Sequence, residues 1–491
     1  MSATRTSSLT RRIVVGTFHY GLGQALPQVV RFLLIPVYTY FLTPDDYGVL
    51  ELAGAFAAFL LIAMRLGVPG AVTRFYFDHE EGSGLSDYVT TIAIFLLGSS
   101  FVVAVLMVLA GPWLFSWLLP GVDFYPVGPL VIGSTLFGCN QNLQDRLVQA
   151  REQSSYAAKL NIGRATVSIC LALLMVVGLR WGVFGMLLAE LIAGVIFFIQ
   201  AGRYLWPDLQ GRFRPELLRS SFAYAAGILP SHFLGNVAPL VTRSYLANVV
   251  SLAAVGQLGI ATRFTLPLST LASAFQTAFN PIYYSLRNDR TSQSLETIAK
   301  MARNVCAIAV TCVLAGMLLF PPLIRLMTPV QFHVAANLVP ILCIGFLGQA
   351  LYTIVGPELF YSKKTYWVPV VSGVAVLVTV ALTLLTARDY GATGLAWGTA
   401  AGSLTSALTA GAISRRLVSV PLRYLDLLRI GSCGFAVAML GIYMPIETTS
   451  LQLPAMAACL VVFPMLLWVT GDPTIREVMH FASDQLKKHP R

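Results

Sequence analysis

Charged residues are scarce in this sequence. Asp, Glu, Lys and Arg make up only 11% of its 491 residues, whereas hydrophobic residues make up 56%. Soluble proteins contain about 25% charged residues, and no polar stretch here is long enough to hold a soluble domain. The composition therefore excludes a soluble protein and predicts a chain that lies mostly within lipid.

Motifs of catalysis and metal binding are also missing. None of the seven cysteines belongs to a CxxC pair, so neither a disulfide framework nor a metal site is expected. The sequence has no HExxH, P-loop or GxSxG motif. Carboxylates on the expected outer side are scattered over short turns, which leaves no site for a membrane glycosyltransferase. We expect no cofactor, no metal and no enzymatic activity.

The sequence instead contains a succession of apolar stretches, each long enough to cross roughly 30 Å of hydrocarbon as a helix. They predict an all-α polytopic membrane protein with about fourteen transmembrane helices. The first stretch is too long for a signal-peptide core and is expected to be retained. The expected spans are 13–42, 47–67, 88–110, 125–145, 157–179, 183–202, 220–246, 254–284, 302–324, 334–358, 366–386, 391–413, 425–445 and 452–470.

The placement of basic residues predicts the orientation. The net charge is +11, and most Lys and Arg residues fall in alternate loops if the N-terminus is inside. The expected outer loops hold only Arg180, Arg325 and Arg388. The positive-inside rule then places both termini in the cytoplasm. The basic charge therefore reflects topology and does not indicate a nucleic-acid partner.

The sequence repeats itself. The segment 228–246 is similar to 25–42, and the segment 388–408 is similar to 179–197. An even number of helices in each half gives both halves the same topology, as in transporters with parallel repeats. The predicted domains are an N-lobe of six helices over 1–219, a C-lobe of six helices over 220–423, and two additional helices with a cytoplasmic tail over 424–491. The two lobes are expected to enclose a central cavity.

Several arginines fall inside expected spans, where a cation is energetically expensive. In the first span Gln24, Gln28 and Arg31 follow an i, i+4, i+7 spacing and share one helix face. Pro27 and Pro36 interrupt the hydrogen-bond ladder and permit a bend there. The arginines within spans are Arg31, Arg65, Arg164, Arg243 and Arg263.

The seventh and eighth spans also carry polar faces. His232, Asn236 and Arg243 share one face of the seventh span, and Arg263 and Thr270 share a stripe of the eighth. This pattern predicts that polar side chains from three helices line the cavity.

Depth distinguishes these arginines from one another. Counted from the outer turns, Arg31 and Arg263 each lie roughly 14 to 17 Å deep, close to the bilayer midplane, so both are expected to be functional. Arg164 lies only a turn or two inside the membrane and is expected to mark topology. Arg65 and Arg243 lie nearer helix ends, where both a functional role and snorkelling to the interface fit them.

Intramembrane carboxylates are few: Glu51, Glu190 and Glu358. None is placed to neutralise Arg31 or Arg263, so the cavity is expected to be net positive and to suit an anion. The planar fork of arginine matches phosphate oxygens. Glu190 is a candidate for ion coupling, whereas Glu358 is expected to serve packing between helices.

Two segments resemble a known family. They are "RFLLIPVYTYFLTPDDYGVLELAGAFAAFLLIAMRLGVPGAVTRFYF" (31–77) and "VGQLGIATRFTLPLSTLASAFQTAFNPIYYSL" (255–286). They resemble the opening and the eighth helix of the polysaccharide-biosynthesis flippases, bacterial lipid-linked oligosaccharide carriers of the multidrug/oligosaccharidyl-lipid/polysaccharide (MOP) superfamily. The resemblance implies two six-helix lobes that alternate between inward-open and outward-open states.

The same resemblance implies a polyprenyl-pyrophosphate-linked cargo, moved from the cytoplasmic to the periplasmic leaflet of the bacterial inner membrane. Relatives that flip the peptidoglycan lipid precursor carry essential arginines in helices one, two and eight, which Arg31, Arg65 and Arg263 match by helix. In such relatives two extra helices form a groove for the lipid tail, and 425–445 and 452–470 fit that role. The multidrug branch typically stops at twelve helices.

Residues and resemblance together predict a flippase for O-antigen, exopolysaccharide or capsule repeat units. Its expected partners are the lipid-linked oligosaccharide, the bilayer and, as candidates, other polysaccharide assembly proteins. The alternatives are a peptidoglycan lipid-precursor flippase, a multidrug antiporter of the same superfamily, and a membrane glycan polymerase or ligase. The residues expected to bind pyrophosphate and acidic sugars are Arg31, Arg263, Arg65 and Arg243, and those expected to offer other polar contacts are Gln24, Gln28, His232, Asn236 and Thr270.

Overall fold

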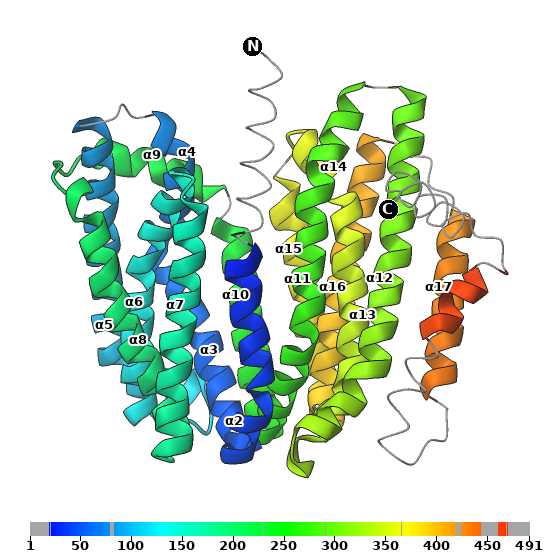
Figure 1. Cartoon of the computed structure of the whole chain (residues 1–491), viewed down its shortest axis with the longest axis horizontal. Coiled ribbons are helices and arrows are strands. Elements are labelled where there is room, and N and C mark those ends of the chain that lie inside the picture. The colour runs from blue at the N-terminus through cyan, green and yellow to red at the C-terminus, as the bar shows by residue number, and fades with distance from the viewer. Residues whose placement is uncertain are drawn as a thin grey trace, which may run out of the picture. The chain divides into compact units, whose positions relative to one another are not determined.

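A computed structural model describes most of the chain, and Figure 1 shows its helices. The described residues are helical apart from short turns and contain no β-strand, which confirms the all-α prediction. Seven helical stretches within them are long and apolar enough to cross a membrane. The described residues are 19, 21–78, 83–227, 229–289, 291–364, 366–418, 424–442, 460–467 and 469. The predicted count of about fourteen spans stays a prediction, because parts of the first and the last two spans lie outside these residues.

By packing, the chain divides into two compact units, Met1–Gly256 and Gln257–Arg491. The predicted lobes 1–219 and 220–423 were defined by a sequence repeat, which packing does not test, so these boundaries and that of the predicted tail segment 424–491 remain predictions. The seventh predicted span belongs to the first unit by contact, because its helices pack against other helices of that unit.

The first unit is built around one central helix, α6 (Phe124–Ala150), which packs against α3, α5, α7 and α8. The α7 helix continues into a π-helical turn, Leu173–Gly178, and α8 is followed by a 3₁₀ turn, Trp206–Asp208. The unit also contains helical residues 21–33 and α2 (Ile35–Phe41), α3 (Pro44–Arg65), α4 (Val68–Phe75), α5 (Ser83–Leu118), α7 (Ser154–Ala172), α8 (Gly182–Leu205), α9 (Pro215–Ala226) and α10 (Leu229–Val249).

The turn "LTPDDYG" between α2 and α3 is fixed by a capping box. The Asp46 N–H donates to Thr43 Oγ1 at 3.2 Å, and the Thr43 N–H donates to Asp46 Oδ2 at 2.8 Å, so two helix-end donors are satisfied reciprocally. Pro44 occupies the first turn, where its missing N–H has no cost. A Cβ on Gly48 would lie 2.1 Å from the Leu252 carbonyl oxygen, so the backbones of α3 and the start of α11 (Leu252–Asp289) are in direct contact there.

Two of the predicted spans are interrupted in the structure. The first breaks at Leu34, shortly before Pro36, which confirms the bend expected from proline. The single helix predicted over 220–246 is wrong, because the chain forms α9 and α10 with a turn at Gly227 between them. Apolar composition alone does not show such a break, since both sides of it are hydrophobic.

In the second unit α12 packs against α13 and α17, and α16 packs against α13 and α15. Glycines allow the α15–α16 contact: Cβ atoms on Gly394, Gly398 and Gly402 would lie 2.7, 2.6 and 1.9 Å from the nearest atoms of α15. Small residues that let backbones approach are a common packing device in membranes. The helices of this unit are α11 from Gln257 onward, α12 (Ser292–Met327), α13 (Val334–Val355), α14 (Pro357–Tyr361), α15 (Trp367–Tyr390), α16 (Ala392–Leu417) and α17 (Tyr424–Ile442), whereas the first residues of α11, 252–256, belong to the first unit.

The penultimate predicted helix, α17, is held on α12. A Cβ on Gly434 would lie 2.6 Å from Val310 Cγ1, and Arg303 Nη1 lies 4.0 Å from Asp426 Oδ2. Within the last predicted span the described residues 460–467 are helical, and Phe463 joins an apolar cluster that contains Val310 of α12 and Val437 of α17.

Candidate functional site

The first helix lies alongside α7. A Cβ on Gly23 would lie 2.7 Å from the Cα of Ala158, and His19 Nδ1 lies 3.3 Å from Ser154 Oγ. Since both contacts join residues 135 apart in sequence, the two helices run in the same direction. Gly23 therefore marks the side of the first helix that faces α7.

The predicted polar stripe points away from α7. At about 100° per residue, Gln24, Gln28 and Arg31 lie roughly 80° to 140° around the helix from Gly23. All three are exposed. Among the described residues Arg31 forms no ion pair or hydrogen bond. The structure thus places the three residues on one accessible face of the first unit, with Arg31 as its cation.

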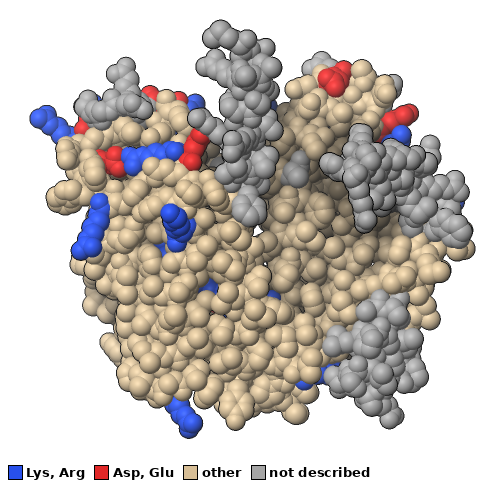
Figure 2. Space-filling model, in the orientation of Figure 1, with Lys and Arg blue, Asp and Glu red and all other residues tan. Residues whose placement is uncertain are grey.

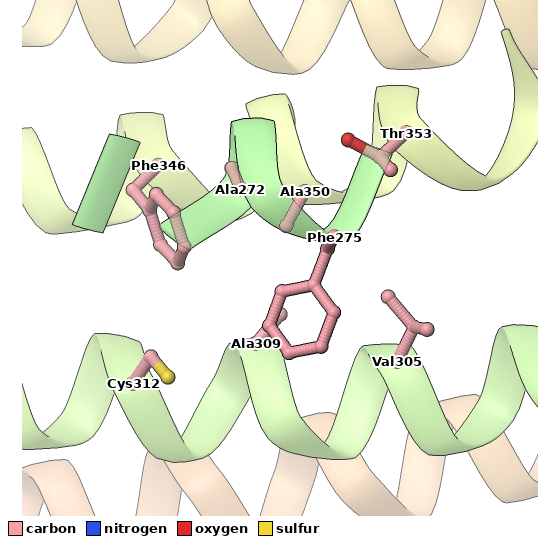
Figure 3. A pocket seen from close by; sticks show the side chains of 8 residues that line it. All are labelled: Ala272, Phe275, Val305, Ala309, Cys312, Phe346, Ala350 and Thr353. Atoms are coloured by element: carbon pink, nitrogen blue, oxygen red, sulfur yellow. The ribbon is translucent and has the colours of Figure 1, made fainter. Parts of the chain in front are cut away.

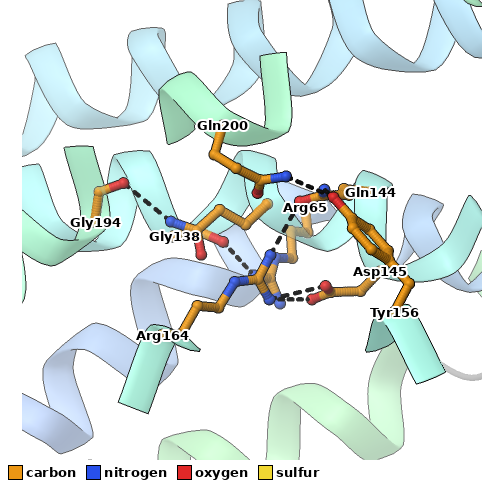
Figure 4. A network of polar contacts seen from close by, with 9 residues as sticks. Arg65, Gly138, Gln144, Asp145, Tyr156, Arg164, Gly194 and Gln200 are labelled. Atoms are coloured by element: carbon orange, nitrogen blue, oxygen red, sulfur yellow. Dashed lines mark hydrogen bonds and ion pairs between the residues drawn. The ribbon is translucent and has the colours of Figure 1, made fainter. Parts of the chain in front are cut away.

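Arg65 lies at the last residue of α3 and contacts α6 (Figure 4). Its Nη2 donates to the Gly138 carbonyl at 3.1 Å, and its Nε is buried without a hydrogen bond. A main-chain carbonyl carries no formal charge, so this bond leaves the positive charge of Arg65 unneutralised. Arg65 is half-buried and therefore does not simply extend into water.

Arg164 pairs with a carboxylate that the sequence reading did not assign to it. Its Nη1 donates to both oxygens of Asp145, at 2.8 and 3.0 Å, and its Nη2 donates to Gln144 Oε1 at 3.2 Å. Tyr156 joins the same network by accepting hydrogen bonds from the amides of Gln144 and Gln200, at 3.3 and 2.7 Å (Figure 4). Arg164 is therefore part of an internal polar network, and not only a marker of topology.

Counting residues along the two antiparallel helices explains why the sequence did not predict this ion pair. In an antiparallel hairpin turning at 151–153, residue 140 lies level with Arg164, and Asp145 is about 7.5 Å nearer the turn. The long arginine side chain spans that offset, so pairing only the residues at equal height in the hairpin does not find the contact. The useful signal was a carboxylate within two turns of the hairpin end, facing an arginine on the next helix.

Arg243 is neutralised by Glu51. Its Nη1 lies 3.3 Å from Glu51 Oε2, and the two side chains are 21% and 11% exposed. In the same helix Asn236 Nδ2 donates to the His232 carbonyl at 2.9 Å, and the His232 side chain is exposed. A role for Arg243 in binding an anion stays a prediction, and it requires the anion to compete with a carboxylate already in place.

In the second unit Arg263 and Thr270 lie in the middle of α11, which remains helical through Pro267 and Pro281. Arg263 is half-buried, and the exposed Thr270 donates its hydroxyl to the Leu266 carbonyl at 3.1 Å. Both residues are thus on an accessible part of α11.

Glu358 is a fixed structural acceptor. It receives hydrogen bonds from Tyr283 Oη at 2.5 Å, Arg287 Nε at 2.9 Å, Arg287 Nη2 at 3.1 Å and Ser362 Oγ at 2.6 Å. These bonds join the end of α11 to α14. The expectation that Glu358 serves packing agrees with this geometry, and Glu190, which is exposed on α8, is left as the candidate for ion coupling.

Two apolar cavities lie apart from these residues. One, of about 10 Å³, lies between α11, α12 and α13, and Figure 3 shows Phe275 extending from α11 toward α12 beside it. A space of that size holds about one water at most. The other, of about 420 Å³, lies between α5, α6 and α8 and has Asn140 as its most polar lining residue. Neither contains a predicted binding residue.

The predicted binding residues differ in how far their charge is already neutralised. Of the four predicted binding arginines, Arg243 faces a carboxylate, whereas the accessible face of the first helix presents Arg31 beside two amide side chains. A guanidinium with neighbouring amides can bind phosphate oxygens and hydroxyl groups. Its positive charge disfavours a cationic ligand.

Comparison with known proteins gives the family context. Residues 13–231 match the family model described as polysaccharide biosynthesis protein. No curated protein sequence matches the chain. The family match supports the resemblance to polysaccharide and lipid-linked flippases, and it includes Gln24, Gln28, Arg31 and Arg65.

Solved structures with the same fold are transporters. The lipid II flippase MurJ, in an inward closed conformation, matches with a TM-score of 0.72 at 14% identity over 93% of this chain and 99% of that one. An inward-facing multidrug resistance MATE family transporter of the MOP superfamily matches with a TM-score of 0.66 at 15% identity, over 82% and 98%. A MOP superfamily transporter from Pyrococcus furiosus matches with a TM-score of 0.57 at 14% identity, over 83% and 95%. The chain is thus a multi-pass membrane protein with the fold of MOP superfamily flippases and transporters.

Proposed function

We propose that this chain, with its MOP superfamily fold, translocates a lipid-linked oligosaccharide across the bacterial inner membrane by alternating access. The cargo is a polyprenyl-pyrophosphate-linked repeat unit of O-antigen, exopolysaccharide or capsule, moved from the cytoplasmic to the periplasmic leaflet. The observation that carries the proposal is the accessible stripe of Gln24, Gln28 and Arg31 on the first described helix.

The chemistry of the stripe favours this cargo. Arg31 and Arg263 bind the pyrophosphate, with Arg65 as a further cation, because guanidinium groups pair with phosphate oxygens through two parallel hydrogen bonds. The amides of Gln24 and Gln28 donate to and accept from sugar hydroxyls. His232, Asn236 and Thr270 extend this polar lining. A net positive lining excludes cationic drugs by like-charge repulsion.

The lipid tail stays in the bilayer while the head group crosses. Moving the long isoprenoid chain through water would cost its full hydrophobic transfer energy, and moving the sugar through hydrocarbon would leave its hydroxyls unpaired. A lateral opening solves both problems. The two C-terminal helices, of which α17 is fixed on α12, are the proposed surface for the tail.

Orientation and coupling complete the proposal. Both termini are cytoplasmic, as the distribution of Lys and Arg favours. Glu190 takes part in ion coupling, and a membrane potential contributes about 2.3 kcal/mol per charge per 100 mV to resetting a positively charged lining.

The peptidoglycan lipid precursor remains an alternative cargo, because it is also a polyprenyl-pyrophosphate-linked sugar and the fold match to the lipid II flippase is extensive. A multidrug antiporter shares the fold, but its cationic substrates do not suit Arg31. A glycan polymerase or ligase would act after translocation.

One experiment separates these possibilities. The gene is deleted in its native host, and an impermeant glycan probe reports which leaflet accumulates lipid-linked sugar. Accumulation hidden from the probe is expected. Accumulation that the probe reaches would mean that a later enzymatic step is missing, and no accumulation would favour drug export. Rescue by a known peptidoglycan-precursor flippase would identify that precursor as the cargo.

A further inference from the structure

A short loop at one end of the first unit is held unusually firmly. It follows the 3₁₀ turn Trp206–Asp208 and leads into α9. Figure 1 shows α9 lying across the ends of the spanning helices of this unit, next to α4. The loop and α9 also connect the first six predicted spans to the next part of the chain.

Side chains from the start of α5 fix this loop. The backbone N–H groups of Gly211, Arg212 and Arg214 donate to Thr90 Oγ1, Asp87 Oδ1 and Thr91 Oγ1, at 3.1, 2.6 and 2.9 Å. The three acceptors are the polar side chains of the first turns of α5.

Two further contacts complete the attachment. Arg214 Nε pairs with Asp87 Oδ2 at 2.6 Å, and a Cβ on Gly211 would lie 2.3 Å from the Asp87 backbone nitrogen. The loop backbone therefore has one position on α5. The side chains of this loop that point outward are therefore attached to a fixed backbone.

The exposed side chains in and around this loop are mostly basic and aromatic, with Glu216 at the start of α9 as an exposed acidic residue. Arg203, Arg212 and Arg219 are exposed and form no ion pair with another described residue. The exposed fractions of Trp206 and Phe213 are 74% and 47%. The one acidic residue of the 3₁₀ turn, Asp208, is already paired with Arg151 at 2.6 Å, so it does not neutralise the three arginines. We call these five side chains the arginine–aromatic surface.

The helix that follows is amphipathic. Leu217, Leu218 and Phe222 pack against an apolar cluster formed with α4, α5 and α6, whereas Arg219 and Ser220 face outward. On the face drawn in Figure 2, the charged side chains of the first unit gather mostly at the end that carries α4 and α9. Below that end is a broad band of other residues, which is the part expected to lie in hydrocarbon.

We propose that the arginine–aromatic surface binds the head groups of anionic phospholipids in the leaflet that it adjoins. Trp206 lies near the end of a helical stretch, Gly182–Asp208, that is long and apolar enough to span a membrane, so the proposal places it at head-group depth, where indole rings are favoured. The neighbouring guanidinium groups then meet lipid phosphates, with each basic residue near an anionic surface contributing to binding. Because the loop is already ordered, binding has little conformational entropy to overcome.

A lipid suits this surface better than a soluble protein does. Exposed arginines alternate along the chain with exposed aromatic residues between 203 and 219, at the end of a candidate spanning helix. A soluble partner that contacted these rings would have to displace bilayer lipids. The expected ligand is an anionic phospholipid such as phosphatidylglycerol, with two acyl chains, or cardiolipin, with four. This inference does not depend on the identity of the transported cargo.

The test uses the full-length protein in lipid-free detergent. Native mass spectrometry measures binding of phosphatidylglycerol, cardiolipin and phosphatidylcholine to wild type, to the R212Q/R219Q double variant and to R180Q/R388Q. Arg180 and Arg388 are also exposed but lie in the loops expected on the opposite side. R212Q/R219Q is expected to bind both anionic lipids about tenfold or more weakly than wild type, and R180Q/R388Q as wild type does.

Three further results decide the proposal. Binding of the anionic lipids should weaken with salt, because the charges are exposed, and R212K/R219K should restore most of it. Equal binding of phosphatidylcholine and phosphatidylglycerol would overturn the proposal, as would unchanged lipid binding by R212Q/R219Q. Loss of a co-purifying protein from R212Q/R219Q with lipid binding intact would show a protein interface instead. Equal thermal unfolding of all variants without lipid would exclude misfolding as the cause of weaker binding.

Discussion

Arg164 donates two hydrogen bonds to Asp145 across the turn that joins α6 to α7. The pair shows that one of the arginines within the expected spans is neutralised inside its own unit. Gln144, which is fully buried, accepts a further bond from the same guanidinium. The network therefore connects α6 and α7 to α8 through Tyr156 and Gln200.

Removing the acid from this pair should destabilise the protein. Asp145→Asn leaves Arg164 without its counter-charge, and we expect the free energy of unfolding to fall by about 1–2 kcal/mol, because the carboxylate is partly exposed. The double variant Asp145→Asn/Arg164→Gln should lose less than the sum of the two single changes. Thermal unfolding in detergent measures both effects. Strict additivity would show that the pair contributes nothing.

Arg31→Ala should strongly reduce transport without affecting the fold. The side chain is exposed and makes no hydrogen bond to another described residue, so its loss leaves no buried group unpaired. Losing a charged hydrogen bond to phosphate should reduce transport about 10- to 100-fold. Polymer export and membrane protein level are measured together, and Arg388→Ala is the control. Full export by Arg31→Ala would remove Arg31 from the proposed site.

Arg31→Lys distinguishes charge from shape at this position. Lysine keeps the charge but cannot form the two parallel bonds of a guanidinium. We expect partial export, between those of wild type and Arg31→Ala. Export equal to that of Arg31→Ala would mean that the fork geometry is essential, and export equal to wild type would mean that charge alone is sufficient.

Two glycines of α3 should respond oppositely to alanine. Gly48→Ala places a methyl group 2.1 Å from the Leu252 carbonyl oxygen, so the backbones must separate, at a cost of about 1–3 kcal/mol. Gly54 has no atom within 4 Å of the added Cβ, and Gly54→Ala should stabilise the helix by up to about 1 kcal/mol. Thermal unfolding of the two variants is compared. Equal shifts would contradict the packing of α3 against the start of α11.

Glu358→Gln should destabilise the second unit. Both carboxylate oxygens of Glu358 accept hydrogen bonds, whereas glutamine has only one acceptor oxygen. The NH₂ group of the glutamine would face the guanidinium of Arg287, and two donors cannot bond to each other. Breaking a buried ion pair on one side costs about 3–5 kcal/mol. The control is Glu190→Gln, whose side chain is exposed and whose effect on thermal unfolding should be small. If Glu190 takes part in ion coupling, Glu190→Gln should instead change the ion dependence of export.

Most of the helical architecture follows from the sequence because long apolar stretches have few alternatives in lipid. The bend before Pro36 is also expected from local residue chemistry. The break between α9 and α10 was not predicted, because hydropathy is similar on both sides of Gly227. That break depends on how α9 packs across α4 and α5, which is a tertiary effect.

Among the site residues, helical spacing alone placed Gln24, Gln28 and Arg31 on one face. It could not find the partners of Arg164 and Arg243, because Asp145 and Glu51 lie on other helices and the register between helices is set by side-chain packing. A long side chain also reaches several ångströms from its own Cα atom, so counting residues along a helix does not locate its partner. The sequence therefore predicts which residues are polar at depth better than it predicts which of them are already neutralised.

The glycine contacts of α16 have a consequence for how the protein is made. Gly398 and Gly402 approach Thr383 and Thr379 of α15 so closely that hardly any side-chain surface separates the two backbones. The two helices are consecutive in the chain, joined at Gly391, so each leaves the ribosome next to its best partner. We expect this hairpin to enter the bilayer already paired and then to pack, through α16, against α13, which precedes both helices in the chain.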